Sequence, residues 1–175
     1  SNAPDIRQEE TDAFDFGYQT VNRDLAEAVV DEIAELDSPI VMVHDYHLYT
    51  MPAMIREQRP DVFLHHFIHI PWTQPDAWRV LPGRIRDTLY RGVLANDIVG
   101  FHTESYRRNF LLCCRELLDD AVVDEVNGTV VLDGVKCAAL VKWPKAIHEG
   151  NGKCVFVVDP STSDAQIEAL AKIFS

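Results

Sequence analysis

Hydrophobic and polar positions along this chain follow two spacings in turn, one typical of buried strands and one typical of helices. A short, wholly apolar run, like that of a strand buried on both faces of a parallel sheet, predicts a strand over residues 39–43, and mainly apolar runs predict strands over residues 62–70 and 97–101. Apolar residues that recur every three or four positions predict helices over residues 22–36, 51–59, 82–93 and 103–117. This alternation predicts an α/β fold with a doubly wound parallel sheet.

Residues that begin or end helices and strands stand at the borders of these segments. Asn22 and Thr103 can each cap the helix that follows, because a short polar side chain accepts a hydrogen bond from the first free N–H groups. Pro52 fits the first turn of its helix, and Pro60 ends that helix. Pro71 ends the second strand.

The pattern changes after Asp119. The stretch GTVVLDGVKCAALV predicts a hairpin that turns at Asp133-Gly134, a pair suited to a tight turn. The stretch CVFVVDPSTSDAQIEALAKIF predicts a strand, a loop and a helix, with Ser163 and Gln166 at the spacing of a capping box. We divide the chain into an expression-tag remnant, an α/β domain and an atypical β-strand/helix tail that can belong to the same domain: residues 1–3, 4–134 and 135–175.

Composition describes one ordinary globular domain of 175 residues, 47% hydrophobic and 25% charged. The net charge of -12 argues against a nucleic-acid or anionic-membrane surface. No apolar run approaches the ~20 residues of a membrane span, and no signal peptide is recognised. The four cysteines, at 113, 114, 137 and 154, lack Cys-x-x-Cys spacing, so we expect buried, reduced thiols in a cytoplasmic protein.

Polar side chains gather where the three predicted strands end. The first strand runs into HDYHL, the second into HIPW and the third into GFHT. Ligands of open α/β sheets bind beyond the carboxyl ends of the strands. We therefore expect Asp45, His69 and His102 to lie on one rim of the sheet.

Each candidate residue also has a structural interpretation. Asp45 can accept two sugar hydroxyls or act as a base, or it can cap the following turn. Tyr46 can bind a phosphate or a sugar, or it can pack with its hydroxyl in water. His69, between two isoleucines, can bind a ligand at the rim or be a histidine of the core.

The seven histidines also raise a metal hypothesis. Imidazoles bind zinc well, and Asp45 could complete a site with His65, His66 and His69. Strand alternation, however, sends His66 to the opposite face, and no His-Glu-x-x-His motif is present. Dinucleotide-binding, P-loop and Gly-x-Ser-x-Gly motifs are also missing.

Four stretches, read in order and spacing, resemble trehalose-6-phosphate synthases. They are VNRDLAEAVV, VHDYHLYTMPAMIREQRPD, HIPW and WRVLPGRIRDTLYRGVLANDIVGFHTESYRRNFLLCC. The resemblance covers residues 18–119 and implies one Rossmann-like domain of a two-domain glycosyltransferase with its active site in the cleft between the domains.

The resemblance implies retaining transfer of glucose from a nucleotide sugar, UDP-glucose, to glucose 6-phosphate, giving trehalose 6-phosphate. Asp45 and Tyr46 would contact the acceptor sugar phosphate, and His69 would be the catalytic residue beside the donor glucose. The donor's own phosphate assists the attack, so we expect no enzymic nucleophile, no metal and no cofactor. The expected partners are these small-molecule substrates, without nucleic acid or membrane. A homo-oligomer is possible on the sequence.

The chain also departs from the family pattern. The family's N-terminal glycine loop and basic residue are missing, and so is the second domain that supplies arginine and lysine to the diphosphate. Phe14 and Phe16 stand where a tryptophan is expected, Trp72 replaces a phenylalanine, and His65 and His66 replace a glycine and an aromatic residue. We therefore expect this chain alone to be inactive.

Several alternatives remain open on the sequence. The tail leaves the family pattern, which a divergent member, a truncated member or a fusion would each explain. The acceptor can instead be glycerol phosphate or a pseudo-sugar, as in related synthases. Two other functional classes also fit the sequence. One is a non-catalytic sugar-phosphate-binding or regulatory domain, and the other is a metal-dependent hydrolase.

Overall fold

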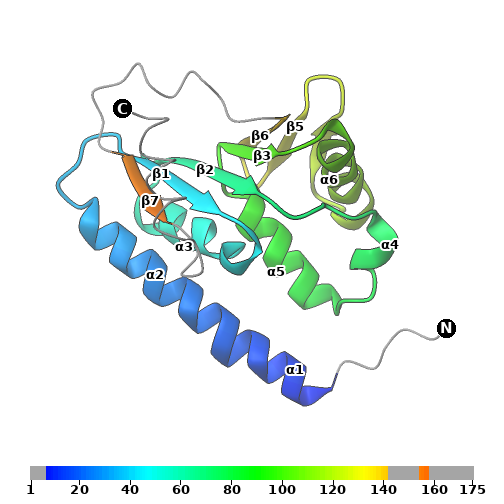
Figure 1. Cartoon of the computed structure of the whole chain (residues 1–175), viewed down its shortest axis with the longest axis horizontal. Coiled ribbons are helices and arrows are strands. Elements are labelled where there is room, and N and C mark those ends of the chain that lie inside the picture. Colours follow the sequence, from blue (N-terminus) through cyan, green and yellow to red (C-terminus); the bar gives the residue numbers. More distant parts are fainter. Residues whose placement is uncertain (1–6, 142–153, 158–175) are drawn as a thin grey trace.

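A single seven-stranded sheet lies at the centre of the computed structural model, which describes residues 7–141 and, as backbone only, residues 154–157 (Figure 1). The strand order is β4-β5-β6-β3-β2-β1-β7. The bounds are β1 Ile40–His44, β2 Phe63–Ile68, β3 Ile98–Phe101, β4 Val122–Asp124, β5 Thr129–Leu132, β6 Val135–Val141 and β7 Cys154–Val157. Neighbours from β7 through β6 pair in parallel, and β5 pairs antiparallel with both β6 and β4.

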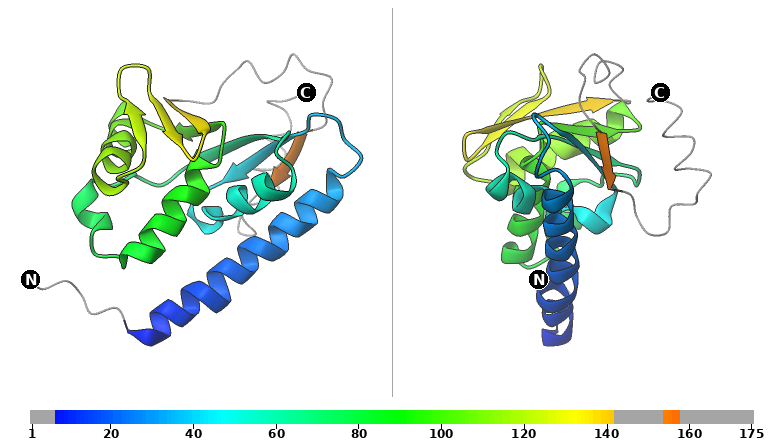
Figure 2. Two further views of the ribbon diagram at one scale, coloured as in Figure 1. Left: turned by 180° about the vertical axis from the view of Figure 1, so that it is seen from behind. Right: turned by 90° about the vertical axis from the view of Figure 1, so that its left-hand side faces the viewer.

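Helices connect the parallel strands, as the sequence pattern predicts. Their bounds are α1 Gln8–Asp12, the π-helix η1 Ala13–Tyr18, α2 Gln19–Glu32, the 3-10 helix η2 Tyr46–Leu48, α3 Met51–Gln58, α4 Pro75–Trp78, α5 Gly83–Leu94 and α6 Glu104–Leu117. Helices α2, α3 and α5 lie along one side of the sheet, and α1 continues the line of α2 away from it (Figure 2). The expected α/β fold with a Rossmann-like parallel sheet is confirmed. The predicted C-terminal helix lies outside the described residues.

Two clusters of buried apolar side chains hold these layers together. One joins α2 and α3 to β1 and β2, and it includes Ile33, Val41 and Ile55, all fully buried. The other joins α5 and α6 to β3, β5 and β6 around Trp72 and Phe110. The strands are buried along most of their length, which explains why they appear in the sequence as mainly apolar runs.

Several predicted local features are confirmed. Thr103 caps α6 by accepting a hydrogen bond from the Tyr106 N–H, and Pro52 lies in the first turn of α3. Asp133 and Gly134 turn the β5–β6 hairpin with positive φ angles of 50° and 81°. Among described side chains, Cys113, Cys114 and Cys137 are free and buried as expected. No helix in the described ranges combines the length and hydrophobicity needed to cross a bilayer.

The predicted cap at Asn22 is wrong. Helical structure begins at Gln8, so Asn22 lies inside α2, where it is fully buried. Its amide nitrogen donates to the carbonyls of Tyr18 and His47, both at 2.9 Å, and its Oδ1 accepts from the Met51 N–H at 3.0 Å. Asn22 therefore fastens α2 to the loop that follows β1.

We expect Asn22→Ala to lower the free energy of unfolding by about 3 kcal/mol, because buried backbone groups of His47 and Met51 would lose their partner. Urea unfolding followed by circular dichroism measures the change. The matched control is Thr20→Ala, at an exposed position of the same helix, which should change stability by less than about 0.5 kcal/mol. Equal effects of the two substitutions would contradict this account of Asn22.

Candidate functional site

The three polar strand ends meet at one edge of the sheet, beyond β1, β2 and β3. His69 follows β2, His102 follows β3, and the two rings approach to 3.3 Å between Nδ1 of His69 and Nε2 of His102. Burial lowers the pKa of His69, while the nearby Asp45 carboxylate acts in the opposite direction and His102 lowers the pKa further. The expected common rim therefore exists, although β2 ends one residue before His69 and both His69 and His102 are exposed.

Asp45 has a backbone conformation that only glycine adopts without strain. Its φ is 63° and its ψ is −179°, a combination that costs about 1–3 kcal/mol for other residues. Its side chain does not cap η2, and its Oδ1 is buried without a hydrogen-bond partner among the described residues. The structural interpretation of Asp45 as a turn cap is therefore wrong.

Strand β2 supports this strained position. The Asp45 N–H donates to the carbonyl of Phe67 at 2.9 Å. On the other side, Nε2 of the fully buried His66 donates to the Asp45 carbonyl, also at 2.9 Å. His66 thus serves as a fixed donor beneath the Asp45 carbonyl.

Tyr46 lies at the surface with 43% of its area exposed, and its ring packs at a tilt against the ring of His47, with centroids 3.8 Å apart. Its carbonyl accepts a 2.7 Å hydrogen bond from the hydroxyl of Tyr18, and this hydroxyl accepts another from the Tyr49 N–H at 2.9 Å. Burial raises the pKa of Tyr18, so its hydroxyl stays protonated and can donate. Tyr18 and Asn22 together hold the loop through its backbone. The sequence analysis does not predict either role, although both residues lie within residues 18–119, which carry the family resemblance.

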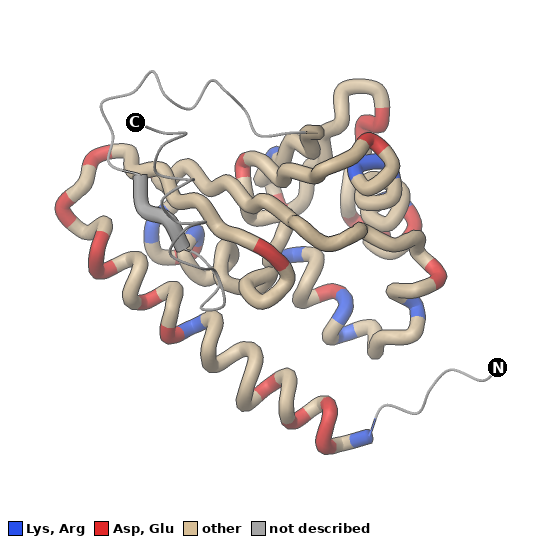
Figure 3. The backbone as a smooth tube through the Cα atoms, in the orientation of Figure 1, with Lys and Arg blue, Asp and Glu red and all other residues tan. Residues whose placement is uncertain are grey.

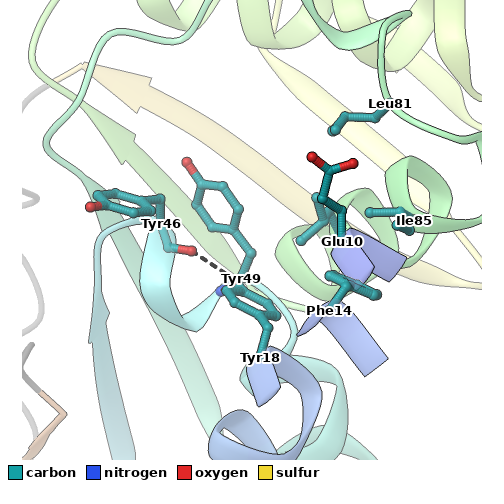
Figure 4. Close-up of a pocket in the computed structure, with 8 residues that line it drawn as sticks. Glu10, Phe14, Tyr18, Tyr46, Tyr49, Leu81 and Ile85 are labelled. Atoms are coloured by element: carbon teal, nitrogen blue, oxygen red, sulfur yellow. Dashed lines mark hydrogen bonds between the residues drawn. The ribbon is translucent and has the colours of Figure 1, made fainter. Parts of the chain in front are cut away.

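An apolar pocket of about 320 Å³ opens beside Tyr46, between the N-terminal helices, η2 and α5 (Figure 4). The rings of Phe14 and Tyr18 stack 5.5 Å apart on one wall. Glu10 points its carboxylate toward the same space as Tyr49. The complete lining is Glu10, Phe14, Tyr18, Tyr46, Tyr49, Leu81, Ile85 and Leu89. Of the two phenylalanines, Phe14 lines this pocket, whereas Phe16 is 78% exposed and does not.

Imidazole rings also pack beneath the rim. His44 Nδ1 lies 2.9 Å from His69 Nε2, and the two rings stack. Burial lowers the pKa of His44 to about 4, and the pKa values of His65 and His66 to about 3, so all three are neutral near pH 7. His65 and His66, which strand alternation sends to opposite faces of the sheet, are both fully buried and uncharged. Across the described residues, no group of three or more His, Cys, Asp or Glu side chains could hold a metal ion.

Arginines near the pocket are already engaged with carboxylates. Arg84 on α5 forms two 2.8 Å hydrogen bonds with Asp15, and Arg79 pairs with Asp76 and Glu116. Acidic residues follow one another along α1 and α2, whereas several basic residues lie on α5 (Figure 3). The Arg84–Asp15 pair fastens η1 to α5 and leaves Arg84 little capacity to bind a diphosphate.

Residues 2–147 match the model of glycosyltransferase family 20. A validamine 7-phosphate valienyltransferase of Streptomyces hygroscopicus is 43% identical over 116 residues, which are 66% of this chain and 23% of that protein. An alpha,alpha-trehalose-phosphate synthase [UDP-forming] of Aspergillus fumigatus is 38% identical over 124 residues, covering 67% and 23%. The chain spans about a quarter of the length of these relatives.

Solved structures agree with this similarity. The N-terminal domain of Candida albicans trehalose-6-phosphate phosphatase superposes with a TM-score of 0.65 at 28% identity, over 79% of this chain and 28% of that one. An alpha,alpha-trehalose-phosphate synthase (UDP-forming) from Burkholderia vietnamiensis gives 0.64 at 27% identity, over 82% and 30%. The resemblance to trehalose-6-phosphate synthases is confirmed at the level of family and fold.

Proposed function

The chain belongs to glycosyltransferase family 20, and from this premise we propose that it is the acceptor-side domain of a retaining glycosyltransferase. The proposed reaction transfers glucose from UDP-glucose to glucose 6-phosphate and gives trehalose 6-phosphate. Asp45 and Tyr46 bind the acceptor sugar phosphate, and His69 contacts the donor sugar at the reaction centre. This assignment rests on the family match together with the position of the three residues at the carboxyl edge of the sheet.

The strained backbone of Asp45 is the observation that carries the proposal. A chain under no functional demand would gain stability from glycine at this position, because Asp45 makes no capping hydrogen bond in exchange for its strain. An oxygen of its carboxylate is buried without a protein partner among the described residues, so it is available to a ligand hydroxyl. A carboxylate can accept hydrogen bonds from two neighbouring sugar hydroxyls.

His69 and the backbone dipoles of the loop after β1 supply the electrostatic part of the proposed mechanism. Retaining transfer without an enzymic nucleophile needs groups that are fixed before charge develops on the sugar. The His69 ring is held by His44, and the loop beside it by Tyr18 and Asn22. Arg84 and Arg79 are paired with carboxylates, so neither is a free cation for the departing diphosphate.

A pseudo-sugar acceptor is the second candidate, favoured by the pocket beside Tyr46. Its walls are aromatic and aliphatic, and Glu10 brings a carboxylate to its mouth. Such a site suits an amine-bearing ring better than a ring covered in hydroxyls, because aromatic faces and a carboxylate both attract cations. The 43% identical relative is described as acting on validamine 7-phosphate, whose name denotes an amine.

Calorimetric titration with glucose 6-phosphate tests the acceptor assignment. We expect Asp45→Ala and Asp45→Gly to remove most of the binding heat, while Asp24→Ala, at an exposed position of α2, leaves it unchanged. Asp45→Gly should also raise the free energy of unfolding by about 1 kcal/mol, since it relieves the backbone strain. A glycine variant that binds as tightly as the parent would contradict the proposal, and validamine 7-phosphate in the same titration separates the two acceptors.

Activity of this chain alone gives a further test. Incubated with UDP-glucose and glucose 6-phosphate, it should release no UDP above a protein-free blank, because Arg84 and Arg79 are already paired with carboxylates and are not free to bind the diphosphate. Ready UDP release would contradict this expectation. Binding of the sugar phosphate without transfer, persisting in a longer version of the protein, would instead favour the non-catalytic or regulatory alternative.

A further inference from the structure

Three histidines from the ends of three neighbouring strands form one hydrogen-bonded row. His44 is the last residue of β1, and its Nδ1 lies 2.9 Å from Nε2 of His69. Nδ1 of His69 lies 3.3 Å from Nε2 of His102. Both ring nitrogens of His69 are therefore engaged by other imidazoles.

The number of protons in such a row restricts its states. A neutral imidazole has one N–H donor and one acceptor nitrogen. If His44 donates to His69, then His69 must donate to His102, and if His102 donates, both hydrogen bonds reverse together. The tautomer of His69 is thus set by its neighbours, as is usual for a histidine whose second nitrogen is hydrogen-bonded.

The two ends of the row are not equivalent. His44 is only 4% exposed and stacks on His69 with ring centroids 5.2 Å apart. His102 is exposed, and its hydrogen bond to His69 is the longer one. Water competes with the outer bond and not with the inner one, so a ligand can reach Nδ1 of His69 by displacing His102, while Nε2 stays with His44.

Phe67 lines the row from within the sheet. Its ring lies edge-on to both His69 and His102, at centroid distances of 4.9 and 5.0 Å. Gly100, directly opposite Phe67 in the β2–β3 register, leaves the space that this ring occupies, since a Cβ there would stand 2.6 Å from the Phe67 ring. The packing therefore limits rotation of the imidazoles about the row.

We propose that His44 is the positioning residue of His69, fixing the tautomer and orientation of its ring so that Nδ1 is the nitrogen presented to a ligand. His44 touches no substrate and acts only through His69. A catalytic role for this arrangement rests on the proposed function. The hydrogen bonds of the row belong to this chain, and they can be detected without turnover.

Nuclear magnetic resonance of protein labelled with ¹⁵N-histidine tests the row directly. We expect His69 to show a single tautomer and a scalar coupling across the hydrogen bond between His44 Nδ1 and His69 Nε2. In His44→Gln, this coupling should be lost and both tautomers of His69 should become populated. The matched control is His47→Gln on the neighbouring η2, which should leave the His69 pattern unchanged, and His102→Ala should preserve the coupling to His44.

Two tautomers of His69 in the parent protein, or no coupling to His44, would overturn the proposal, even if His44→Gln failed to fold. A His69 pattern that is the same in His44→Gln as in the parent would overturn it as well. Failure of the glucose 6-phosphate titration would count against the proposed function and would leave these resonances unaltered, so the two failures are distinguishable.

Discussion

The protein should become much less stable between about pH 7 and about pH 5. His44, His65 and His66 are buried as neutral rings with pKa values of about 4, 3 and 3, while the unfolded chain has the ordinary histidine value of about 6.5. Between these values the unfolded state binds more protons than the folded state. Stability is therefore complete above the unfolded pKa and falls as the pH drops below it.

The expected loss is large compared with the stability of a typical domain. At about pH 5, each of the three histidines costs about 2 kcal/mol, or about 6 kcal/mol together, against a usual stability of about 5–15 kcal/mol. Urea unfolding at about pH 7.5, 6 and 5 measures this loss as a falling midpoint.

Variants identify the residues responsible for the acid sensitivity. His66→Gln keeps an N–H donor near the Asp45 carbonyl but cannot be protonated, so about a third of the pH dependence should disappear. His47→Gln, at an exposed position of η2, should retain the full pH dependence. A parent protein equally stable at about pH 7.5 and about pH 5 would show that these rings are not buried as described.

Gly92→Ala should be among the most damaging single substitutions, lowering the free energy of unfolding by about 3 kcal/mol or more. A Cβ at Gly92 would collide with the carbonyl oxygen of Tyr49 and stand 2.7 Å from Cα of Thr50. Both are backbone atoms of the segment that follows η2, so neither can move aside without shifting the loop that carries Asp45 and Tyr46. Helix α5 would therefore separate from the site.

Gly83→Ala is the matched control, because it is the same substitution at the first residue of the same helix. No atom lies within 4 Å of a Cβ at Gly83, and its φ is not in the positive range. Alanine there should be neutral or stabilise by up to about 1 kcal/mol. Thermal and urea unfolding of the two variants compare them, and similar stabilities would contradict the close approach of α5 to the loop.

The sequence predicted the repeating elements well because their physical causes are local. Mainly apolar runs indicate β1 to β3, and the Asp133-Gly134 turn and the Thr103 cap depend only on residues close by in the chain. The position of β6 could not be predicted in this way. It lies beside β3 in the centre of the sheet because of pairing between residues about forty positions apart.

The candidate site was predicted only where residues follow strands directly. Asp45, His69 and His102 lie at the common edge, as parallel strands require. The roles of Tyr18 and Asn22 were missed because each acts across about thirty residues, through backbone groups that no motif displays. Asn22 looks like a cap in the sequence because the residues before it show no clear apolar period. In the structure these residues form the π-helix η1, which continues into α2.

Chemical-shift mapping with glucose 6-phosphate shows whether the carboxyl edge of this sheet binds a phosphorylated sugar. We expect the backbone amide signals of Asp45 and Tyr46 and the ring signals of His69 to shift together as the ligand is added, and these shifts to vanish in Asp45→Ala. Shifts confined to another part of the chain, or none at a ligand concentration that saturates the calorimetric signal, would contradict it.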